Sequence, residues 1–569
     1  MERQRHTTSA RPAVRGTFSP PGRWRHTVVP HLAPTLGITG TVIALERPDS
    51  QCGGSHLLSY CGLAPSGRQA AKTHLLLKKG FRVKSLLNSA RVLAKNAVAE
   101  DGTKYGDAIR ALHVWLDAQR DYDRLIGISA GVVHGDRLLW SAGYGSLDAP
   151  GKVPTKADTI YSIGSISKLF TSIAVMQLVE AGKLRLDDEL TSAAPHLTLP
   201  RAAPGGGPIT LRNMLTHSSG LPAEGGLPGF EAPDFRFPTQ AELRLQFAQV
   251  TSLQRSGERY RYSNFAMSLL AEVIEAASGQ RYEEYVHQHV LVPLGLKDTQ
   301  PRLPIELLGQ RLALGYGPIL RDGTRALHKP FDTRGYAAAA GFSSTVPDLA
   351  RFASWQFRLL KGGGREVLRA DTLQEMQRVH WTDPDGRITA GLGFSVSFSG
   401  STRLVGHTGN TPGYFSVLTM QPQDELAVIV LTNNEVSVDE YARSMCMLLD
   451  KGRSLPTPEV SGSVLSAYSG LYSRRNRGGE QAILPWGREL ALIPLPSRDP
   501  AGEMLLLAHT KDDIFQLIRP DGSHGEEVSF LRDGTGKVTG YKHAAHVSPR
   551  MRELPSSPAD LRPFGTSDA

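Results

Sequence analysis

Residues 165–168 read Ser-Ile-Ser-Lys and open the most strongly helical stretch of the chain. Apolar residues follow at helical spacing over 166–179, and Gly182 ends the pattern. Residues three apart share one face of a helix, so the Lys168 ammonium can reach the Ser165 hydroxyl. A serine hydroxyl is a weak nucleophile that needs a base, and burial can lower the pKa of a lysine enough to make it one. The segment predicts a nucleophilic serine at a helix N-terminus; a capping serine followed by a solvated lysine is the alternative reading.

Strand patterns lie on both sides of this helix in the sequence. Two β-rich runs flank His134-Gly135-Asp136, which indicates a hairpin. The intervening chain is dominated by short helices and Pro/Gly-rich loops, and 264–278 and 281–292 are its clearest helices. Strands return near the end of this region at 402–408, 414–420 and 425–432, and a helix at about 437–450 follows them. We expect an α+β fold in which one antiparallel sheet is flanked by helices and carries a helical subdomain.

The C-terminal part has a different pattern. A linker is expected over 451–462, and short strands then recur at 468–473, 482–495, 504–509, 514–518, 527–532 and 538–546. This regular spacing predicts a small all-β barrel. Three regions follow: a basic, largely disordered N-terminal extension over 1–100, the main domain over 101–452 and a β domain over 463–569.

The net charge of +9 is concentrated in the N-terminal extension. The first hundred residues hold 15 Lys or Arg against 4 Asp or Glu, and the rest of the chain is balanced at 49 against 51. We therefore expect no nucleic-acid partner. No apolar run reaches the roughly 18 residues of a membrane-spanning helix. A signal peptide is not evident, so a cytoplasmic location is the default expectation and export the alternative.

Two further motifs make the nucleophile reading specific. Tyr262-Ser263-Asn264 precedes a helix 97 residues after Ser165, and His407-Thr408-Gly409-Asn410 lies on a predicted strand 145 residues later. In this order the three motifs resemble the Ser-x-x-Lys, Ser-Asp-Asn and Lys-Thr-Gly set of penicillin-recognising serine enzymes. The middle motif has the Tyr-x-Asn form of class C β-lactamases, and the third has histidine in place of lysine.

The chain is therefore identified as a member of the serine β-lactamase and penicillin-binding-protein family, which includes class C-like hydrolases and family VIII-type esterases. The resemblance covers about residues 107–451 and extends to phrases such as LTHSSGL at 215–221 and GFSST at 341–345. The C-terminal strands resemble, more loosely, the lipocalin-like β domains that follow some of these hydrolases.

The resemblance implies a role for each motif residue. Ser165 is the nucleophile, Lys168 its base, and Tyr262 moves protons. Asn264 binds the lysine or a substrate carbonyl, with capping of the next helix as its alternative. In the third motif His407 faces the substrate, and the backbone N–H groups of Ser165 and Asn410 form the oxyanion hole. Thr408 and Gly409 complete the substrate-binding strand.

The expected activity is hydrolysis through a covalent acyl-enzyme, with neither metal nor organic cofactor. The partner is a small acyl substrate, and the oligomeric state is left open. A lysine in the third motif offers a permanent ammonium, which suits substrates that carry a carboxylate. Histidine has an ordinary pKa of about 6.5, so it is mostly neutral at pH 7.5 and attracts such a carboxylate less. We therefore expect a carboxylesterase-like enzyme. The alternatives are a β-lactamase, a D-amino-acid peptidase or carboxypeptidase, and an inactive scaffold or binding protein.

Overall fold

The computed structural model describes residues 105–198, 206–226, 229–455, 463–474 and 479–554, with the backbone of two strands nearer the N-terminus. These strands, β1 (Gly40–Ala44) and β2 (Leu58–Gly62), pair antiparallel. The prediction for residues 1–100 otherwise falls outside the described residues. Among the described residues, no helix is long and apolar enough to cross a membrane.

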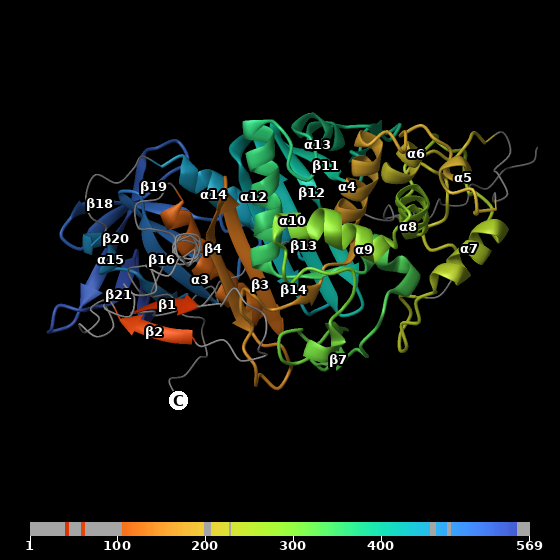
Figure 1. The fold of residues 1–569 in the computed structure, drawn as a ribbon. Helices are drawn as coiled ribbons and strands as arrows, with labels where there is room; N and C mark the ends of the chain where they lie inside the picture. Colours follow the sequence, from red (N-terminus) through yellow and green to blue (C-terminus); the bar gives the residue numbers. More distant parts are fainter. Residues whose placement is uncertain are drawn as a thin grey trace, which may run out of the picture.

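An eight-stranded antiparallel sheet forms the centre of the molecule (Figure 1), in the order β4-β3-β14-β13-β12-β11-β10-β9. Its strands β3 and β4 come from the start of the described chain, and β14 completes the sheet beside them, with Ile128 opposite Thr432. This arrangement confirms the predicted α+β fold. The strands are β3 (Gly127–His134), β4 (Arg137–Gly145), β9 (Trp381–Thr382), β10 (Thr389–Ala390), β11 (Ser395–Ser399), β12 (Thr402–Thr411), β13 (Tyr414–Gln421) and β14 (Leu426–Thr432).

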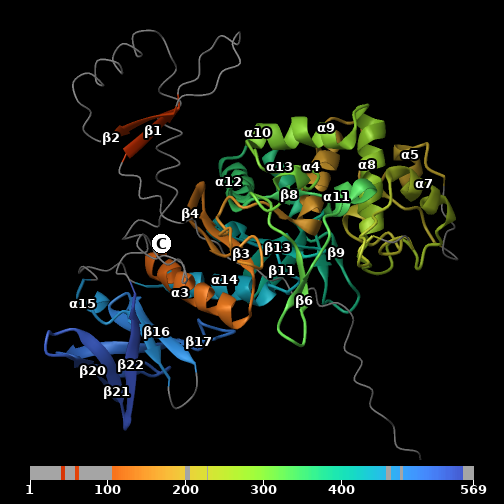
Figure 2. The ribbon, with the colours of Figure 1, turned by 90° about the horizontal axis from the view of Figure 1, so that it is seen from below.

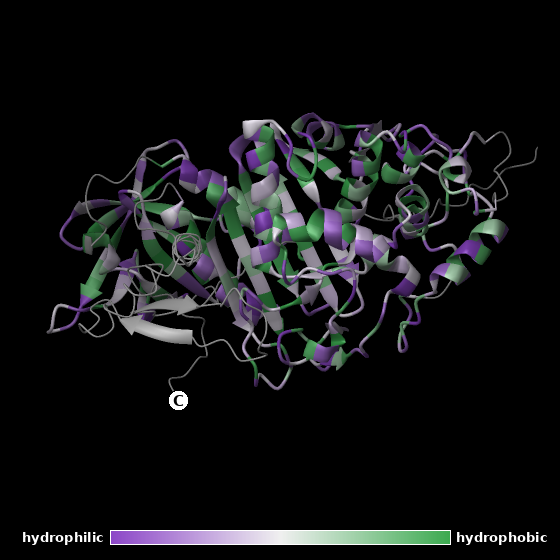
Figure 3. Ribbon diagram, in the orientation of Figure 1, coloured by the Kyte–Doolittle hydropathy of each residue, from purple (hydrophilic) through white to green (hydrophobic). Residues whose placement is uncertain are grey.

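Helices cover both faces of the sheet. The central strands β3 and β14 are therefore buried on both sides, as their nearly continuous runs of buried residues show. One face packs on α3 (Gly106–Tyr122) and α14 (Asp439–Arg453). The other face packs on α12 (Val346–Gly362) at β3, β4 and β14 and on α4 (Ser167–Glu180) at β12, and α8 (Asn264–Ser278) packs against α4. Figure 3 shows apolar residues concentrated in these strands and in the helix faces beside them. Two hydrophobic cores result, one on each face of the sheet.

The chain between β4 and β9 forms the helical subdomain. The predicted helix at 264–278 is confirmed by α8, whereas the one at 281–292 is divided into α9 (Tyr282–Val286), the π-helical η2 (His287–Leu291) and α10 (Val292–Leu294). The remaining elements of this region are short: β5 (Tyr161–Ser162), η1 (Gly164–Ile166), α5 (Leu190–Ala193), α6 (Leu211–Leu215), α7 (Gln240–Gln249), η3 (Ile305–Leu307), β6 (Tyr316–Ile319), β7 (Arg325–Leu327), η4 (Arg334–Tyr336), α11 (Ala337–Ala340), β8 (Ser343–Ser344) and α13 (Ala370–Met376). The short η5 (Pro422–Asp424) connects β13 to β14.

The C-terminal strands close into an eight-stranded antiparallel barrel in which each strand pairs with the next and β15 pairs with β22. The short α15 (Ser463–Ser466) precedes them. The strands are β15 (Gly470–Ser473), β16 (Glu480–Trp486), β17 (Glu489–Leu495), β18 (Leu505–Lys511), β19 (Ile514–Ile518), β20 (His524–Arg532), β21 (Val538–His543) and β22 (His546–Glu553). A cluster of buried aromatic and aliphatic side chains, including Tyr472, Phe515 and Phe530, fills its own core.

Two of the strands expected in this region are in fact hairpins. The stretch 482–495 is interrupted by a two-residue turn at Gly487, where φ is +63°. The stretch 538–546 turns at Ala544, a non-glycine residue with φ of +52°. The second turn was missed because its two central residues are alanines, which carry none of the Gly, Asn or Asp signals of tight turns.

Helix α3 lies between the barrel and the sheet (Figure 2). Its Trp115 indole N–H donates to the Ser497 carbonyl at 2.9 Å, and Asp123 at its C-terminal end pairs with Arg498. Trp486 from β16 is buried in the same core as the α3 side chains. The barrel therefore shares one of the two sheet cores.

Candidate active site

The turn that carries Ser165 is held by close backbone contact with β12. Ser165 lies in η1, and α4 begins two residues later. Gly164 has φ of +47°, and a Cβ atom there would lie 2.6 Å from the Asn410 nitrogen. Gly409 is as tightly placed, since its Cβ would meet the Ile163 carbonyl oxygen at 1.9 Å. Only glycine fits these two positions, which brings Ser165 next to the third motif.

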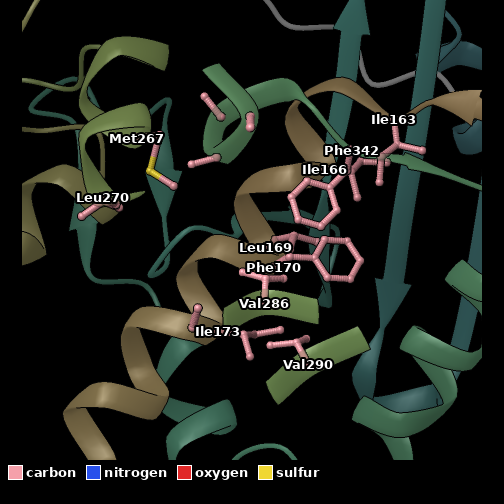
Figure 4. Packing of buried hydrophobic residues seen from close by; sticks show 14 of the residues in the cluster. Ile163, Ile166, Leu169, Phe170, Ile173, Met267, Leu270, Val286, Val290 and Phe342 are labelled. Atoms are coloured by element: carbon pink, nitrogen blue, oxygen red, sulfur yellow. The ribbon is translucent and has the colours of Figure 1, made fainter. Parts of the chain in front are cut away.

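Helix α4 is anchored by the larger hydrophobic core, as Figure 4 shows. Phe170 stacks on Phe342, with ring centroids 4.9 Å apart and an interplanar angle of 11°. Other side chains of the helix and its neighbours belong to the same core: Ile166, Leu169, Ile173, Met267, Leu270, Val286 and Val290. Burial on this scale fixes the helix and hence the positions of Ser165 and Lys168.

Lys168 is fully buried and makes three polar contacts. Its Nζ lies 2.8 Å from Ser165 Oγ. It also donates to Asn264 Oδ1 at 2.7 Å and to the Ala339 carbonyl at 2.8 Å. The Tyr262 hydroxyl donates to Ser165 Oγ at 2.6 Å. The structure thus brings together the four side chains that were predicted from the first two motifs.

The middle motif is positioned by the start of α8. Ser263 caps this helix, since its Oγ accepts from the Ala266 N–H at 2.8 Å. The alternative reading of Asn264 as the cap is therefore wrong. Asn264 occupies the first turn, and its side chain bridges Lys168 and Glu224.

The third motif lies on β12, and strand pairing determines which way each residue faces. His407 is opposite Leu418, and its ring lies 6.2 Å from that of Tyr262. Its Nδ1 is 2.6 Å from the Thr408 carbonyl oxygen. Thr408 is opposite Val417, which belongs to the core on the far face of the sheet, so its side chain is directed there.

The backbone of Asn410 faces the nucleophile. Pro412 and Gly413 form a two-residue hairpin loop that pairs Thr411 with Tyr414. In such a hairpin the pair next to the loop is hydrogen-bonded, and hydrogen-bonded and non-hydrogen-bonded pairs then alternate along the strands. Asn410 and Phe415 form the next, non-hydrogen-bonded pair, so the Asn410 N–H points away from β13, on the side of η1. The side chain of Asn410 is exposed.

Burial shifts the proton affinities of the site in opposite directions. Desolvation lowers the pKa of the Lys168 ammonium well below its ordinary value, although the Glu224 charge opposes the shift. Desolvation likewise raises the pKa of the Tyr262 phenol well above its ordinary value. These shifts favour the neutral amine of Lys168 and the protonated phenol of Tyr262, which place a base and an acid beside one serine hydroxyl.

The structure adds residues to the site that the motifs do not contain. Glu224 Oε1 accepts from Asn264 Nδ2 at 2.7 Å, and the Ala339 carbonyl binds Lys168. His217 packs on Tyr262 with ring centroids 4.3 Å apart, and its Nδ1 accepts from the Ser263 N–H. Glu224 lies shortly after the LTHSSGL phrase, and that adjacency to a family phrase is the one signal that could have indicated it.

The third motif has histidine in place of the family's lysine, and the two arginines near it in sequence make contacts of their own. Arg403 donates to the Gln377 carbonyl. Arg387 pairs with Asp385 in an exposed loop.

An antiparallel sheet with a helical subdomain, and a buried lysine hydrogen-bonded to a serine at a helix start, define a serine hydrolase of the acyl-transfer type. A family model described as Beta-lactamase matches residues 115–445, more than half of the chain. The protein belongs to the β-lactamase family.

Curated proteins from distant organisms are similar to this chain. The D-alanyl-D-alanine-carboxypeptidase/endopeptidase AmpH of Escherichia coli is 28% identical over 325 residues, which cover 55% of this chain and 80% of that protein. Putative beta-lactamase-like 1 of Homo sapiens is 28% identical over 416 residues, 68% of this chain and 80% of that protein.

Solved structures share the fold at lower identity. The octameric penicillin-binding protein homologue of Pyrococcus abyssi superposes with a TM-score of 0.53 at 24% identity, over 77% of this chain and 98% of that one. The D-amino acid amidase of Ochrobactrum anthropi superposes with a TM-score of 0.52 at 24% identity, over 61% of this chain and 100% of that one.

Proposed function

We propose that the protein is a carboxylesterase-like member of its family that forms an acyl-enzyme on Ser165 with Lys168 as base. The hydrogen bonding of Lys168 carries this proposal. Asn264 Oδ1 and the Ala339 carbonyl can only accept hydrogen bonds, so they take two N–H groups of the lysine. The remaining tetrahedral position on Lys168 Nζ points at Ser165 Oγ. Of the three partners, only this hydroxyl can also donate a hydrogen bond. In a neutral amine the remaining position holds the lone pair, which is then directed at the hydroxyl proton of Ser165.

Proton transfer in both half-reactions follows from this arrangement. In acylation Ser165 Oγ bonds to the substrate carbonyl carbon while its proton moves to Lys168 Nζ. The bond to the leaving group then breaks, and that group takes the Tyr262 hydroxyl proton, which Lys168 replaces. In deacylation water attacks the acyl carbon and its proton passes to Lys168, directly or through Tyr262. The bond between the acyl carbon and Ser165 Oγ then breaks, and Ser165 Oγ takes that proton.

The oxyanion of each tetrahedral intermediate would be held by the backbone N–H groups of Ser165 and Asn410. The close contact of Gly164 with the Asn410 nitrogen supports this assignment. One such donor is worth about 10²–10³ in rate. His407 and Gly409 would line the substrate side of the same strand, whereas Thr408, whose side chain is directed to the far face of the sheet, would contribute only its backbone.

The preference for esters rests on the histidine in the third motif. Arg403 and Arg387 are engaged with other groups, so His407 is the residue on β12 that would meet a substrate carboxylate. Because histidine, unlike lysine, carries no permanent charge near neutral pH, we expect uncharged acyl esters to be preferred over substrates with a carboxylate. A D-amino-acid peptidase is the second candidate, because AmpH is described as a D-alanyl-D-alanine carboxypeptidase and endopeptidase. A β-lactamase and an inactive scaffold are the remaining alternatives.

Active-site labelling tests the enzyme against the scaffold. A fluorophosphonate or fluorescent penicillin should label the protein, and Ser165→Ala should abolish labelling. Turnover should fall at least about 10³-fold in both Ser165→Ala and Lys168→Ala, because members of one catalytic unit act together. Near-normal turnover in Lys168→Ala would exclude lysine as the base.

A substrate panel tests the choice of substrate. Nitrophenyl acetate should be cleaved with higher kcat/KM than a chromogenic cephalosporin or a D-Ala-terminated peptide. His407→Lys should shift the ratio of β-lactam to ester cleavage upward by about tenfold. Preference of the wild type for the peptide would establish the second candidate instead.

A further inference from the structure

A continuous hydrogen-bonded chain joins the buried lysine to a glutamate outside the three motifs. Lys168 Nζ donates to Asn264 Oδ1 at 2.7 Å, and Asn264 Nδ2 donates to Glu224 Oε1 at 2.7 Å. Glu224 Oε2 is buried and has no hydrogen-bond partner among the described residues. One amide therefore bridges a buried cation site and a largely buried carboxyl group.

The loop that carries Glu224 is tied to the first turn of α8. The Phe265 N–H donates to the Ala223 carbonyl at 2.9 Å, and the Tyr336 hydroxyl donates to the Glu224 carbonyl at 2.8 Å. Gly225 has φ of +64°, and a Cβ there would meet the Phe265 ring at 2.8 Å. The carboxyl group is thus held beside Asn264 by the backbone on both sides of it.

We propose that Glu224 is a positioning residue and counter-charge for Lys168, acting through Asn264, and that it sets the pH at which Lys168 becomes a base. This inference rests on the proposed function of Lys168. Two physical effects carry it, one on the orientation of the amide and one on the charge of the lysine.

The first effect concerns the Asn264 amide. Its NH₂ group donates and its oxygen accepts, so a carboxylate on one side directs the oxygen to the other side, toward Lys168. Without Glu224 the amide could rotate and present its NH₂ group to the lysine. Lys168 would then lose one of its two acceptor-only partners, and its third position would no longer be held on Ser165.

The second effect is electrostatic. Burial of an ammonium is unfavourable unless an opposite charge lies near, and Glu224 is the acid whose charge raises the pKa of Lys168. Burial raises the pKa of Glu224, and the hydrogen bond from Asn264 and the charge of Lys168 oppose this shift. Removal of the carboxylate should therefore lower the pKa of Lys168 further, and the enzyme should stay active at lower pH.

The other titratable groups facing Lys168 cannot substitute for this carboxylate. Tyr262 lies over the lysine, 4.8 Å from Nζ to the ring centroid, and burial keeps its phenol protonated. Burial and the Lys168 charge lower the pKa of His217 well below its ordinary value, so this ring is neutral near pH 7. His407 on β12 can add only positive charge.

The test is the pH dependence of kcat/KM for nitrophenyl acetate, measured with the full chain. Activity requires neutral Lys168, so it falls on the acid side as that group gains its proton. In Glu224→Gln this acid limb should move to lower pH by about one unit, because a charge is removed but an acceptor for Asn264 remains. Glu224→Ala should move the limb similarly and lower the plateau more, because it also removes the acceptor.

Two further variants control the experiment. Glu231→Gln removes a charge from the same loop but leaves Asn264 untouched, since Glu231 binds the Gly229 N–H, and its acid limb should match that of the wild type. Glu224→Asp retains the charge with a shorter reach, and its limb should lie between those of the wild type and Glu224→Gln. It also provides the measurement if the Gln variant does not fold.

An unchanged acid limb in Glu224→Gln would overturn the proposal. If kcat/KM instead fell more for an alanine nitrophenyl ester with a free amine than for the acetate, Glu224 would be a contact for a substrate ammonium. Failure of the proposed function itself is recognised separately, by turnover that survives in Ser165→Ala or Lys168→Ala.

Discussion

At the scale of single residues, the site depends on two glycines as much as on its reactive side chains. Gly164 and Gly409 allow η1 and β12 to approach until backbone atoms are in contact. The distance between Ser165 and the Asn410 N–H is therefore determined by main-chain packing, which is more rigid than side-chain packing. This is the kind of support that a preorganised oxyanion site requires.

Gly164→Ala tests this contact. The added Cβ would lie 2.6 Å from the Asn410 nitrogen, so the turn or the strand must shift, and kcat/KM should fall at least about tenfold. Gly182→Ala is the matched control at the other end of α4. Its φ is also positive, at +70°, but a Cβ there meets nothing within 4 Å. It should cost about 1 kcal/mol of unfolding free energy and leave turnover unchanged. Equal kinetics in the two variants would contradict the role of the contact.

At the scale of elements, the start of α8 organises the site. Ser263 Oγ accepts from Ala266 N–H and donates to the Pro222 carbonyl at 2.7 Å. Its two neighbours in the chain are Tyr262 and Asn264, which contact Ser165 and Lys168. The N-cap of α8 therefore does two things: it begins the helix and it positions two site residues.

Ser263→Ala should therefore affect stability and activity together. The loss of the cap and an unpaired carbonyl should lower the free energy of unfolding by about 1–2 kcal/mol. Turnover should fall about tenfold because small displacements of positioning groups are costly. Thr239→Ala removes the cap of α7, which has a full capping box, and should reduce stability alone. Thermal unfolding and ester hydrolysis measure both effects; unchanged turnover in Ser263→Ala would show that the cap does not position the site.

At the scale of the whole molecule, the barrel has an internal core and an apolar outer face. Tyr472, Phe515 and Phe530 belong to the internal core, whereas Trp486 and Ile493 are buried against the α3 side of the hydrolase fold. Each strand of the barrel pairs with the next in the chain, and the lipocalin likeness stays a prediction. We expect the separated barrel to fold on its internal core and to expose the apolar surface that otherwise packs on α3.

We expect a 463–569 fragment to give the far-UV circular dichroism of β structure and to self-associate. Its internal core supplies the stability, and the exposed face around Trp486 drives association. Replacing Trp486 and Ile493 with serine should make the fragment monomeric in size-exclusion chromatography. A random-coil spectrum would show that the barrel requires the hydrolase domain to fold.

Much of the fold was predictable because its signals are local. The hairpin around Gly135, the helix at 264–278 and the strands at 402–408, 414–420 and 425–432 each follow from periodicity and turn residues within one short segment. The turn at Ala544 was not predictable, because there the pairing of two long strands overrides weak turn residues.

By itself, the sequence determined the α+β class, the order of the three motifs and the nearness of Ser165 to Lys168, since residues three apart on the helical run from η1 into α4 share one face. The motif resemblance implied a place for Tyr262 beside that pair, but only the tertiary structure brought Glu224 and Ala339 to it and placed the barrel on α3. These partners lie far apart in sequence, and no local pattern specifies their contact. They meet because the burial of two extended cores folds the helical subdomain and the barrel onto opposite sides of one sheet.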